Sequence, residues 1–236
     1  MNILFRRLLR KANSLNRKYL GSYLINNRIK LLNHFQIQYL LDVGANTGQF
    51  AYYTRHTGYK NNIISFEPLT EAFGILGKFA SHDKKWEIVN AAIGDMDGEI
   101  EINISENLQS SSILEMMPDH VKSAPESAYC GKEKVKIHRL DSIIDGYVPN
   151  LEEAFLKIDT QGFEKNVLLG AEQSLKKLKG LQLELSTKEL YKGETLFNEM
   201  LDFILQKGFV IHSLEPGFYD KKSGQLLQVD AIFYRG

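Results

Sequence analysis

The residues best suited to chemistry form a glycine-punctuated turn directly after an apolar run. Residues 39–43 are largely apolar apart from Asp42, and the turn that follows reads Gly44, Ala45, Asn46, Thr47 and Gly48. Glycine lets the backbone turn sharply and approach a ligand closely. Glu67 lies nineteen residues beyond Gly48, at the end of the next apolar run. A carboxylate at that place can accept hydrogen bonds from both hydroxyls of a ribose, so the pattern indicates a nucleoside site.

The spacing of the glycines favours one kind of nucleoside over another. The dinucleotide fingerprint has glycine at its first, third and sixth positions, so that a pyrophosphate can sit on the helix start. Here the pattern is Gly-x-x-x-Gly, with Asn46 inside it and Asp42 just before it. A carboxylate beside the turn disfavours a pyrophosphate and suits a ligand with an ammonium and a sulfonium. The turn therefore favours S-adenosylmethionine, and the alternative is a turn whose glycines serve packing only.

A second set of carboxylates follows a later apolar run. Asp159 comes directly after residues 154–158, so we expect it at the same sheet edge as Glu67. Glu164 lies near the start of the next helix, where the helix dipole favours an anion. Two such carboxylates beside a cofactor could share general-base and anchoring roles, so we predict Asp159 and Glu164 as the catalytic residues. Glu184 and Asp230 could join them, whereas the structural alternative makes Glu164 an ordinary first-turn acid.

Other candidate groups are weaker. His138 lies in a strand-like run and is the next candidate for the base. The carboxylates of Asp159, Glu164 and Glu184 could bind Mg²⁺, which takes oxygen ligands. Zinc is not indicated, because no Cys and His residues have ligand spacing. We predict a site without a metal.

Short strands and helices alternate along most of the chain. Strand-like runs occupy residues 39–43, 63–66, 86–90, 154–158 and 181–185, and helical patterns occupy 48–57, 70–80, 163–178 and 194–207. This alternation predicts an α/β fold with a parallel sheet and helices on both faces. The last two runs, 209–212 and 228–234, are joined by a link too short for a crossover helix, so that pair must be antiparallel. The result is a Rossmann-like, mostly parallel seven-stranded sheet with an antiparallel last strand.

One stretch interrupts this rhythm. Residues 99–104 and 135–138 alternate like the strands of an antiparallel excursion, and a long polar segment, 105–133, joins them. A loop of that length inside a compact domain is usually functional or disordered. We therefore predict that it is a lid over the acceptor, with Ser111 and Ser112 facing the substrate.

Four motifs in order resemble the FkbM family of methyltransferases. They read DVGANTG at 42–48, FEP at 66–68, NAAIGD at 90–95 and KIDTQGFE at 157–164, and the resemblance covers roughly residues 39–236. It implies a class I methyltransferase fold, S-adenosylmethionine as cofactor and O-methylation of a hydroxyl on a sugar, glycan or secondary metabolite. By this similarity the first motif holds the methionyl part, Glu67 and the adjoining Pro68 the ribose, and Ala92 the adenine region. A stretch at 110–114 also matches a serine-rich segment of the family.

Residues 1–38 lie outside the resemblance. They carry eight basic residues and no acid, although the whole chain has a formal net charge of zero. We expect a basic helical extension that packs on the acidic body, with weak contact to an anionic membrane surface as the alternative. The neutral total gives no reason to expect a nucleic-acid partner. The single cysteine, Cys130, allows no internal disulfide and fits a reducing compartment, so a cytoplasmic location is expected.

The sequence thus predicts one methyltransferase domain at 39–236 that acts on a small-molecule or glycan acceptor. Two alternatives share its first motif. One is a nicotinamide-dependent oxidoreductase, which the glycine spacing and the terminal hairpin disfavour. The other is a Rossmann-like scaffold without catalytic activity. Neither the identity of the acceptor nor the oligomeric state follows from the sequence.

Overall fold

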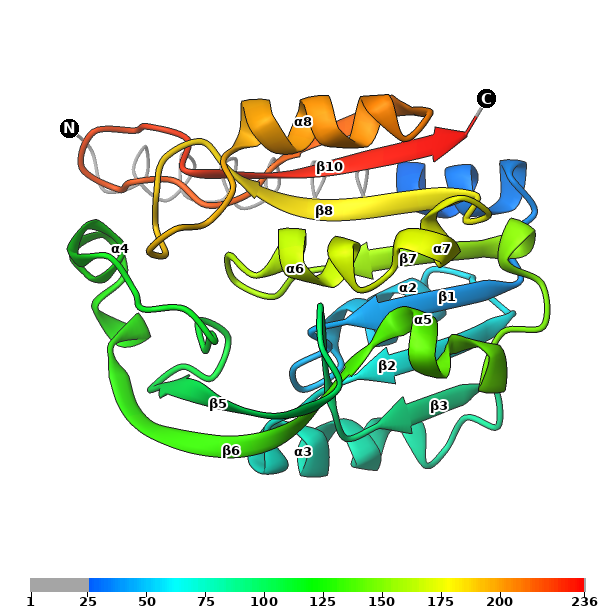
Figure 1. The fold of residues 1–236 in the computed structure, drawn as a ribbon, viewed down its shortest axis with the longest axis horizontal. Helices are drawn as coiled ribbons and strands as arrows, with labels where there is room; N and C mark the ends of the chain where they lie inside the picture. The colour runs from blue at the N-terminus through cyan, green and yellow to red at the C-terminus, as the bar shows by residue number, and fades with distance from the viewer. Residues whose placement is uncertain (1–25, 236) are drawn as a thin grey trace, which may run out of the picture.

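The computed structural model describes residues 26–235, and its centre is a seven-stranded sheet (Figure 1). The strands lie in the order β3-β2-β1-β7-β8-β10-β9. Neighbouring strands are parallel, except that β10 is antiparallel to both of its neighbours. Their bounds are β1 (Tyr39–Val43), β2 (Asn62–Phe66), β3 (Trp86–Val89), β7 (Ala154–Ile158), β8 (Gly180–Ser186), β9 (Phe209–Pro216) and β10 (Gln228–Arg235). The predicted α/β class and the antiparallel last strand are confirmed.

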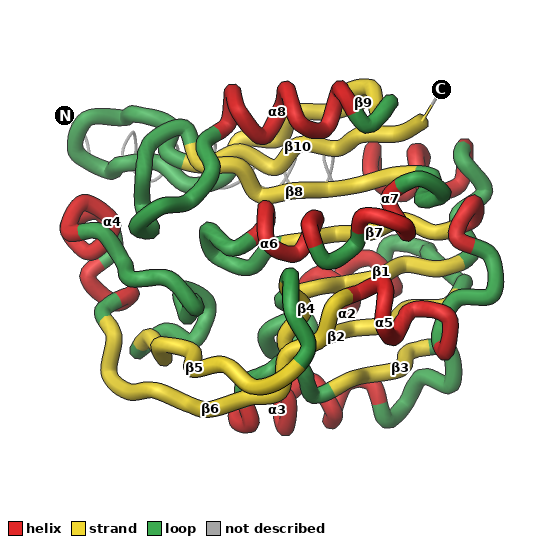
Figure 2. Tube along the Cα trace, viewed as in Figure 1, coloured by secondary structure: helices red, strands yellow, loops and turns green. Residues whose placement is uncertain are grey.

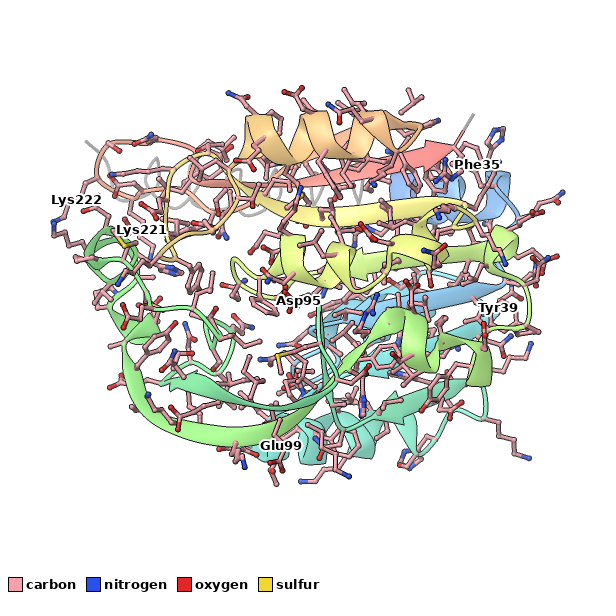
Figure 3. All side chains as sticks on the ribbon, in the orientation of Figure 1. Phe35, Tyr39, Asp95, Glu99, Lys221 and Lys222 are labelled. Atoms are coloured by element: carbon pink, nitrogen blue, oxygen red, sulfur yellow. The ribbon has the colours of Figure 1, made fainter. Side chains whose placement is uncertain are left out.

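The order of the strands creates a ligand-binding edge. From β1 the chain runs outward through β2 and β3, and it later returns to the other side of β1 as β7 and β8. Open α/β sheets bind ligands at the carboxyl ends of the strands beside such a reversal. The glycine turn after β1 and Asp159 after β7 both lie there. Figure 3 marks the opposite edge with Tyr39, at the start of β1.

Helices cover both faces of the sheet, which explains the continuous apolar character of its inner strands. They are α2 (Gln49–His56), α3 (Thr70–Ala80), α5 (Leu140–Ile143), α6 (Glu164–Leu169), α7 (Glu172–Leu175) and α8 (Phe197–Gln206). One buried cluster joins α5, α6, α7 and α8 to one face, and a second joins α2, α3 and residues 26–34 to the other. Strands buried on both faces need mostly apolar side chains, and β7 is buried throughout, with Lys157 as its one charged residue.

The predicted helical segment 163–178 is divided into two short helices, α6 and α7. They are separated at Gly170, whose backbone lies against the carbonyl of Gly94. A Cβ atom at Gly170 would stand 1.7 Å from that oxygen. This backbone contact, made across 76 positions of sequence, requires a glycine where the two helices separate, and it cannot be read from the helical pattern.

A smaller sheet stands over the carboxyl edge of the large one (Figures 1 and 2). Its strands are β4 (Ala92–Gly94), β5 (Gly98–Ser105) and β6 (Tyr129–Arg139), in the order β4-β6-β5. The pairing of β5 with β6 confirms the antiparallel excursion. However, β6 begins six residues before the predicted 135, and the helix α4 (Pro118–Ser123) lies within the segment predicted as loop. The added residues at the start of β6 are polar because this part of the strand is exposed. Lys132 and Lys134 pair there with Glu101 and Glu99, respectively.

The start of the described chain packs on the large sheet. Residues 26–34 are helical, and Leu32 and Ile37 are buried in the core. Arg28 forms an ion pair of 2.8 Å with Glu215 of β9. The rest of the predicted basic extension, residues 1–25, lies outside the described residues. Between residues 26 and 235, no helix has the length and apolar character needed to cross a membrane.

Candidate functional site

A cavity of about 350 Å³ lies at the carboxyl ends of β1, β2, β7 and β8. That volume falls within the roughly 300–1,000 Å³ typical of small-molecule sites. Nine of the predicted site residues line it: Gly44, Ala45, Asn46, Glu67, Pro68, Ala92, Ser111, Ser112 and Asp159. Four others, Asp42, Thr47, Gly48 and Glu164, do not line it. The cavity therefore brings together candidate residues from every predicted motif.

The glycine turn has the shape that a closely approaching ligand requires. Gly44 has a φ of +72°, and a Cβ atom there would stand 1.9 Å from the backbone oxygen of Asp159. Gly48 has a φ of +89°, and its missing side chain leaves room for Leu76 of α3. Gly44 thus lets β1 and β7 converge at the cavity, whereas Gly48 serves the packing of α3. The packing alternative therefore describes Gly48 correctly.

Glu67 is held by the backbone of two segments. Its Oε2 accepts a hydrogen bond of 2.7 Å from the Asn46 N–H, and its Oε1 accepts one of 2.9 Å from the Leu69 N–H. Burial raises the pKa of Glu67 to about 7, against the opposing effect of these donors. Each carboxylate oxygen has more than one lone pair, so the two oxygens can also accept the hydroxyls of a ribose. The residues at this end of the cavity fit a nucleoside.

Asp42 lies behind the glycine turn, fully buried, and its carboxylate is paired with Lys157. The two residues are partners in the parallel pairing of β1 with β7, and the distance from Lys157 Nζ to Asp42 Oδ1 is 3.1 Å. Lys157 also donates to the Gly44 carbonyl and lies 3.6 Å from Asp159 Oδ2. Burial alone would lower the pKa of Lys157, but Asp42 and Asp159 raise it above its ordinary value. The ammonium group therefore stays charged and joins the turn to Asp159.

Asp159 shares a hydrogen-bond network with a second carboxylate. The side-chain amide of Gln161 donates to Asp159 Oδ1 and to Glu184 Oε2, each at 2.8 Å. The side-chain oxygen of Gln161, Oε1, accepts from the Tyr191 hydroxyl at 2.7 Å. Gln161 itself has a φ of 55°, in the left-handed region that non-glycine residues seldom occupy. Strained positions of this kind concentrate at functional sites.

Glu164 has a structural contact set. Its Oε1 accepts from the backbone N–H groups of Thr160 and Gly162 and from the Thr160 hydroxyl. Burial raises the pKa of Glu164 to about 7. Because Glu164 does not line the cavity, this geometry favours Asp159 as the base and assigns Glu164 to bracing the turn that carries it.

The two residues predicted to face the methyl acceptor, Ser111 and Ser112, line the cavity and also hold the 106–117 segment in place. Ser112 Oγ donates to the backbone carbonyl of Gln161 at 2.6 Å, which attaches the 106–117 segment to the turn that carries Asp159. Ser111 Oγ accepts from the Ser105 N–H at 3.0 Å. The Tyr191 hydroxyl reaches the Ser110 carbonyl from the opposite side, and Met116 forms a bridge with Tyr191. The segment is thus fastened across the cavity, as a closed lid would be.

Several residues of the site carried no usable signal in the sequence. Lys157 stands in the quoted KIDTQGFE motif, but its role depends on Asp42, which is 115 positions away. Gln161 stands in the same motif but is uncharged, and Tyr191 lies outside the quoted motifs. His138 lies outside the cavity, 3.5 Å from Asp97. Within the described residues, no three Asp, Glu, His or Cys side chains are grouped to hold a metal ion.

Comparisons with known proteins agree with this arrangement. The methyltransferase FkbM domain model matches residues 42–211. The 2-O-methyltransferase NoeI of Sinorhizobium fredii (strain NBRC 101917 / NGR234) is 23% identical over 195 residues, which are 80% of this chain and 79% of that protein.

Two solved structures resemble the chain more distantly. Magnesium protoporphyrin IX methyltransferase of Synechocystis PCC 6803 has a TM-score of 0.49 at 8% identity, over 92% of this chain and 81% of the other. An rRNA methylase of Streptococcus thermophilus has a TM-score of 0.47 at 11% identity, over 88% and 93% of the two chains. The family match and the sheet order agree with a methyltransferase, and the oxidoreductase alternative is wrong. The chain belongs to the FkbM methyltransferase family, and S-adenosylmethionine is its cofactor.

Proposed function

We propose that this protein methylates a hydroxyl oxygen of a small polyhydroxylated acceptor, such as a sugar, a glycan or a secondary metabolite. The observation that carries the proposal is that Glu67 and Asp159 line one cavity from opposite sides of β1. The first carboxylate suits a ribose and the second suits the removal of a proton from an alcohol. The relative named as a 2-O-methyltransferase supports oxygen as the acceptor atom.

The chain's own residues have separable roles in this reaction. S-adenosylmethionine supplies, when bound, a methyl group made electrophilic by a sulfonium. Asp159 accepts the proton of the acceptor hydroxyl as its oxygen attacks. Gln161 fixes the orientation of that carboxylate through its 2.8 Å hydrogen bond, and Lys157 Nζ lies 3.6 Å from its other oxygen. The fastened lid holds the acceptor in line, and such alignment can contribute greatly to the rate.

The lining of the cavity suits a neutral, hydroxyl-rich acceptor. Gln109, Ser111 and Gln161 offer hydrogen-bonding groups beside Asp159. The charged side chains are mostly acidic, since Glu67, Asp159 and Glu184 face a single ammonium, that of Lys157, which is already paired. A polyanionic nucleic-acid backbone requires unpaired basic groups. These features support a small molecule or glycan over RNA.

A methyl-transfer assay tests the proposal. Purified protein is incubated with S-adenosylmethionine labelled at the methyl group and with panels of monosaccharides, oligosaccharides and polyphenols. We expect label in an alkali-stable ether of one hydroxylated class and none in RNA. Label found only in RNA would overturn the proposed acceptor. Failure of both S-adenosylmethionine and S-adenosylhomocysteine to bind would instead favour the scaffold alternative.

A further inference from the structure

Carboxylates outnumber the positive groups around the inner part of the cavity. Asp159 and Glu184 line it, and Asp230 lies beside Glu184 as its partner in the pairing of β10 with β8. Lys157, which lies 3.6 Å from Asp159 Oδ2, also pairs with Asp42. Arg28 acts on Asp230 but is paired with Glu215. Acidic side chains are therefore in excess over basic ones next to the candidate base.

Two uncharged hydrogen-bond donors hold the side chain of Glu184 in place. The side-chain amides of Gln161 and Gln228 both donate to its Oε2, at 2.8 and 2.7 Å. Two amide donors hold the carboxylate in place without supplying a positive charge. Glu184 thus remains available to a cation that enters the cavity.

We propose that Glu184, joined to Asp159 through Gln161, recognises the positive charge of the cofactor's sulfonium. The cavity then binds S-adenosylmethionine more tightly than S-adenosylhomocysteine, and the product leaves once methyl transfer has removed that charge. This inference rests on the proposed function, because it takes the methyl group to lie near Asp159. It assigns Glu184 a role in selecting the substrate form of the cofactor over the product form.

The order of the strands supports placing the nucleoside at one end of the cavity and the sulfonium at the other. Glu67 follows β2, on one side of β1, whereas Asp159 follows β7 and Glu184 lies in β8, on the other side. A nucleoside held by Glu67 and Ala92 directs the remainder of the cofactor toward β7 and β8. The group that differs between substrate and product is the sulfonium, which is a cation in one and a neutral thioether in the other. An unpaired carboxylate is the natural group to distinguish them.

The charged groups around Glu184 determine whether the preference for S-adenosylmethionine rises or falls with pH. Burial raises the pKa of Glu184, and Asp159, Asp230 and Glu164 raise it further, against the opposing effect of Lys157. These groups come from the turn after β7, from β10, from α6 and from β7. A cation beside the carboxylate favours its ionised form. Binding of S-adenosylmethionine should therefore release a proton from Glu184 to the solvent, and the preference for it should grow as the pH rises.

Titration calorimetry with both ligands tests the inference. Affinities and proton release are measured for S-adenosylmethionine and S-adenosylhomocysteine, in buffers of different ionisation enthalpy between pH 6 and 8. In Glu184→Gln we expect the preference for S-adenosylmethionine to fall by roughly tenfold or more, the scale of one close charge pair. The extra proton released with S-adenosylmethionine should disappear as well.

Two matched substitutions control for changes that affect any ligand. Glu67→Gln should weaken both ligands by the same factor, because both carry the ribose. Glu194→Gln alters a carboxyl outside the cavity whose pKa burial also raises, and it should leave the preference unchanged.

The outcomes separate this inference from the proposed function. If both ligands bind and Glu184→Gln keeps the wild-type preference and proton release, the inference is wrong while the proposed function stands. If neither ligand binds to the wild-type protein, the proposed function fails. Should Glu184→Gln not fold, Asp230→Asn decides, since removing this neighbouring charge should move the rise in preference to lower pH. An unchanged pH profile in that variant would also refute the inference.

Discussion

At the scale of single residues, the two ends of the cavity depend on carboxylates of different kinds. Glu67 has backbone partners on both oxygens, so replacing it by alanine would disturb the turn as well as the ligand. Glu67→Gln keeps the shape and removes the charge. Hydrogen bonds to charged groups contribute roughly 1.5–3 kcal/mol each, so we expect S-adenosylhomocysteine to bind at least tenfold more weakly. Calorimetry measures this, and wild-type affinity in a folded variant would show that Glu67 is not the ribose ligand.

Asp159 and Glu164 are separated by the structure and should be separated by mutation. Asp159→Asn should lower turnover by roughly 10²–10⁴-fold, the usual contribution of general acid–base catalysis, with cofactor affinity near wild type. Glu164→Gln retains an oxygen for the Thr160 and Gly162 donors and should keep most of the turnover. Single-turnover rates with an accepted substrate measure both. Full turnover in Asp159→Asn would remove it as the base, and His138 would then be tested.

At the scale of elements, the contact between α6 and the small sheet depends on a missing side chain. Gly170→Ala would place a Cβ atom against the Gly94 carbonyl, where neither backbone can easily move. We expect a loss of unfolding free energy at or above the roughly 1–3 kcal/mol typical of overpacking. Gly74→Ala is the matched control, because it lies within α3 with nothing in the way and should gain about 0.5–1 kcal/mol. Equal urea midpoints for the two variants would contradict the contact.

At the scale of the whole molecule, buried carboxyls should make the protein less stable as the pH rises. The folded pKa values of Glu67 and Glu164 are about 7, above those of an unfolded chain. Between pH 4.5 and 7 the folded protein therefore binds more protons than the unfolded one, and the stability contributed by these groups is lost over that range. Glu164→Gln should flatten the wild-type curve, by roughly 1–3 kcal/mol between pH 5 and 8. Parallel curves for the two proteins in chemical denaturation would count against this account.

The amino-terminal segment can be tested by deletion. Removal of residues 1–38 should destabilise the protein, because Leu32, Ile37 and the Arg28–Glu215 pair would be lost. Removal of residues 1–25 alone should also lower the unfolding free energy if the basic extension packs on the body. We keep packing of the basic extension as the main proposal and weak contact with anionic lipid as the alternative. Liposome flotation distinguishes them, since each basic residue near such a surface contributes about 1 kcal/mol. Salt-sensitive flotation that is lost without residues 1–25 would favour the membrane.

The sequence determined the parts of this protein that depend on neighbouring residues. Apolar runs and the conformational freedom of glycine were enough to predict the strand at 39–43, the glycine turn after it, and the place of Glu67 at the end of the next strand. The antiparallel last strand follows from the short link before it. The nucleoside end of the cavity was predictable for the same reason, because its residues lie at the ends of consecutive strands.

The tertiary structure decided whatever depends on residues that are distant in the chain. Asp42 pairs with Lys157, and Asp159 shares Gln161 with Glu184, only because β1, β7 and β8 are neighbours in the sheet. The fold also brings the backbone of Gly170 against the carbonyl of Gly94, 76 positions away, where only glycine fits. Charge and packing act through space, with no regard for sequence separation. A list of acidic residues therefore shows which groups are available, whereas the fold decides which of them are paired, which brace a turn and which can reach a ligand.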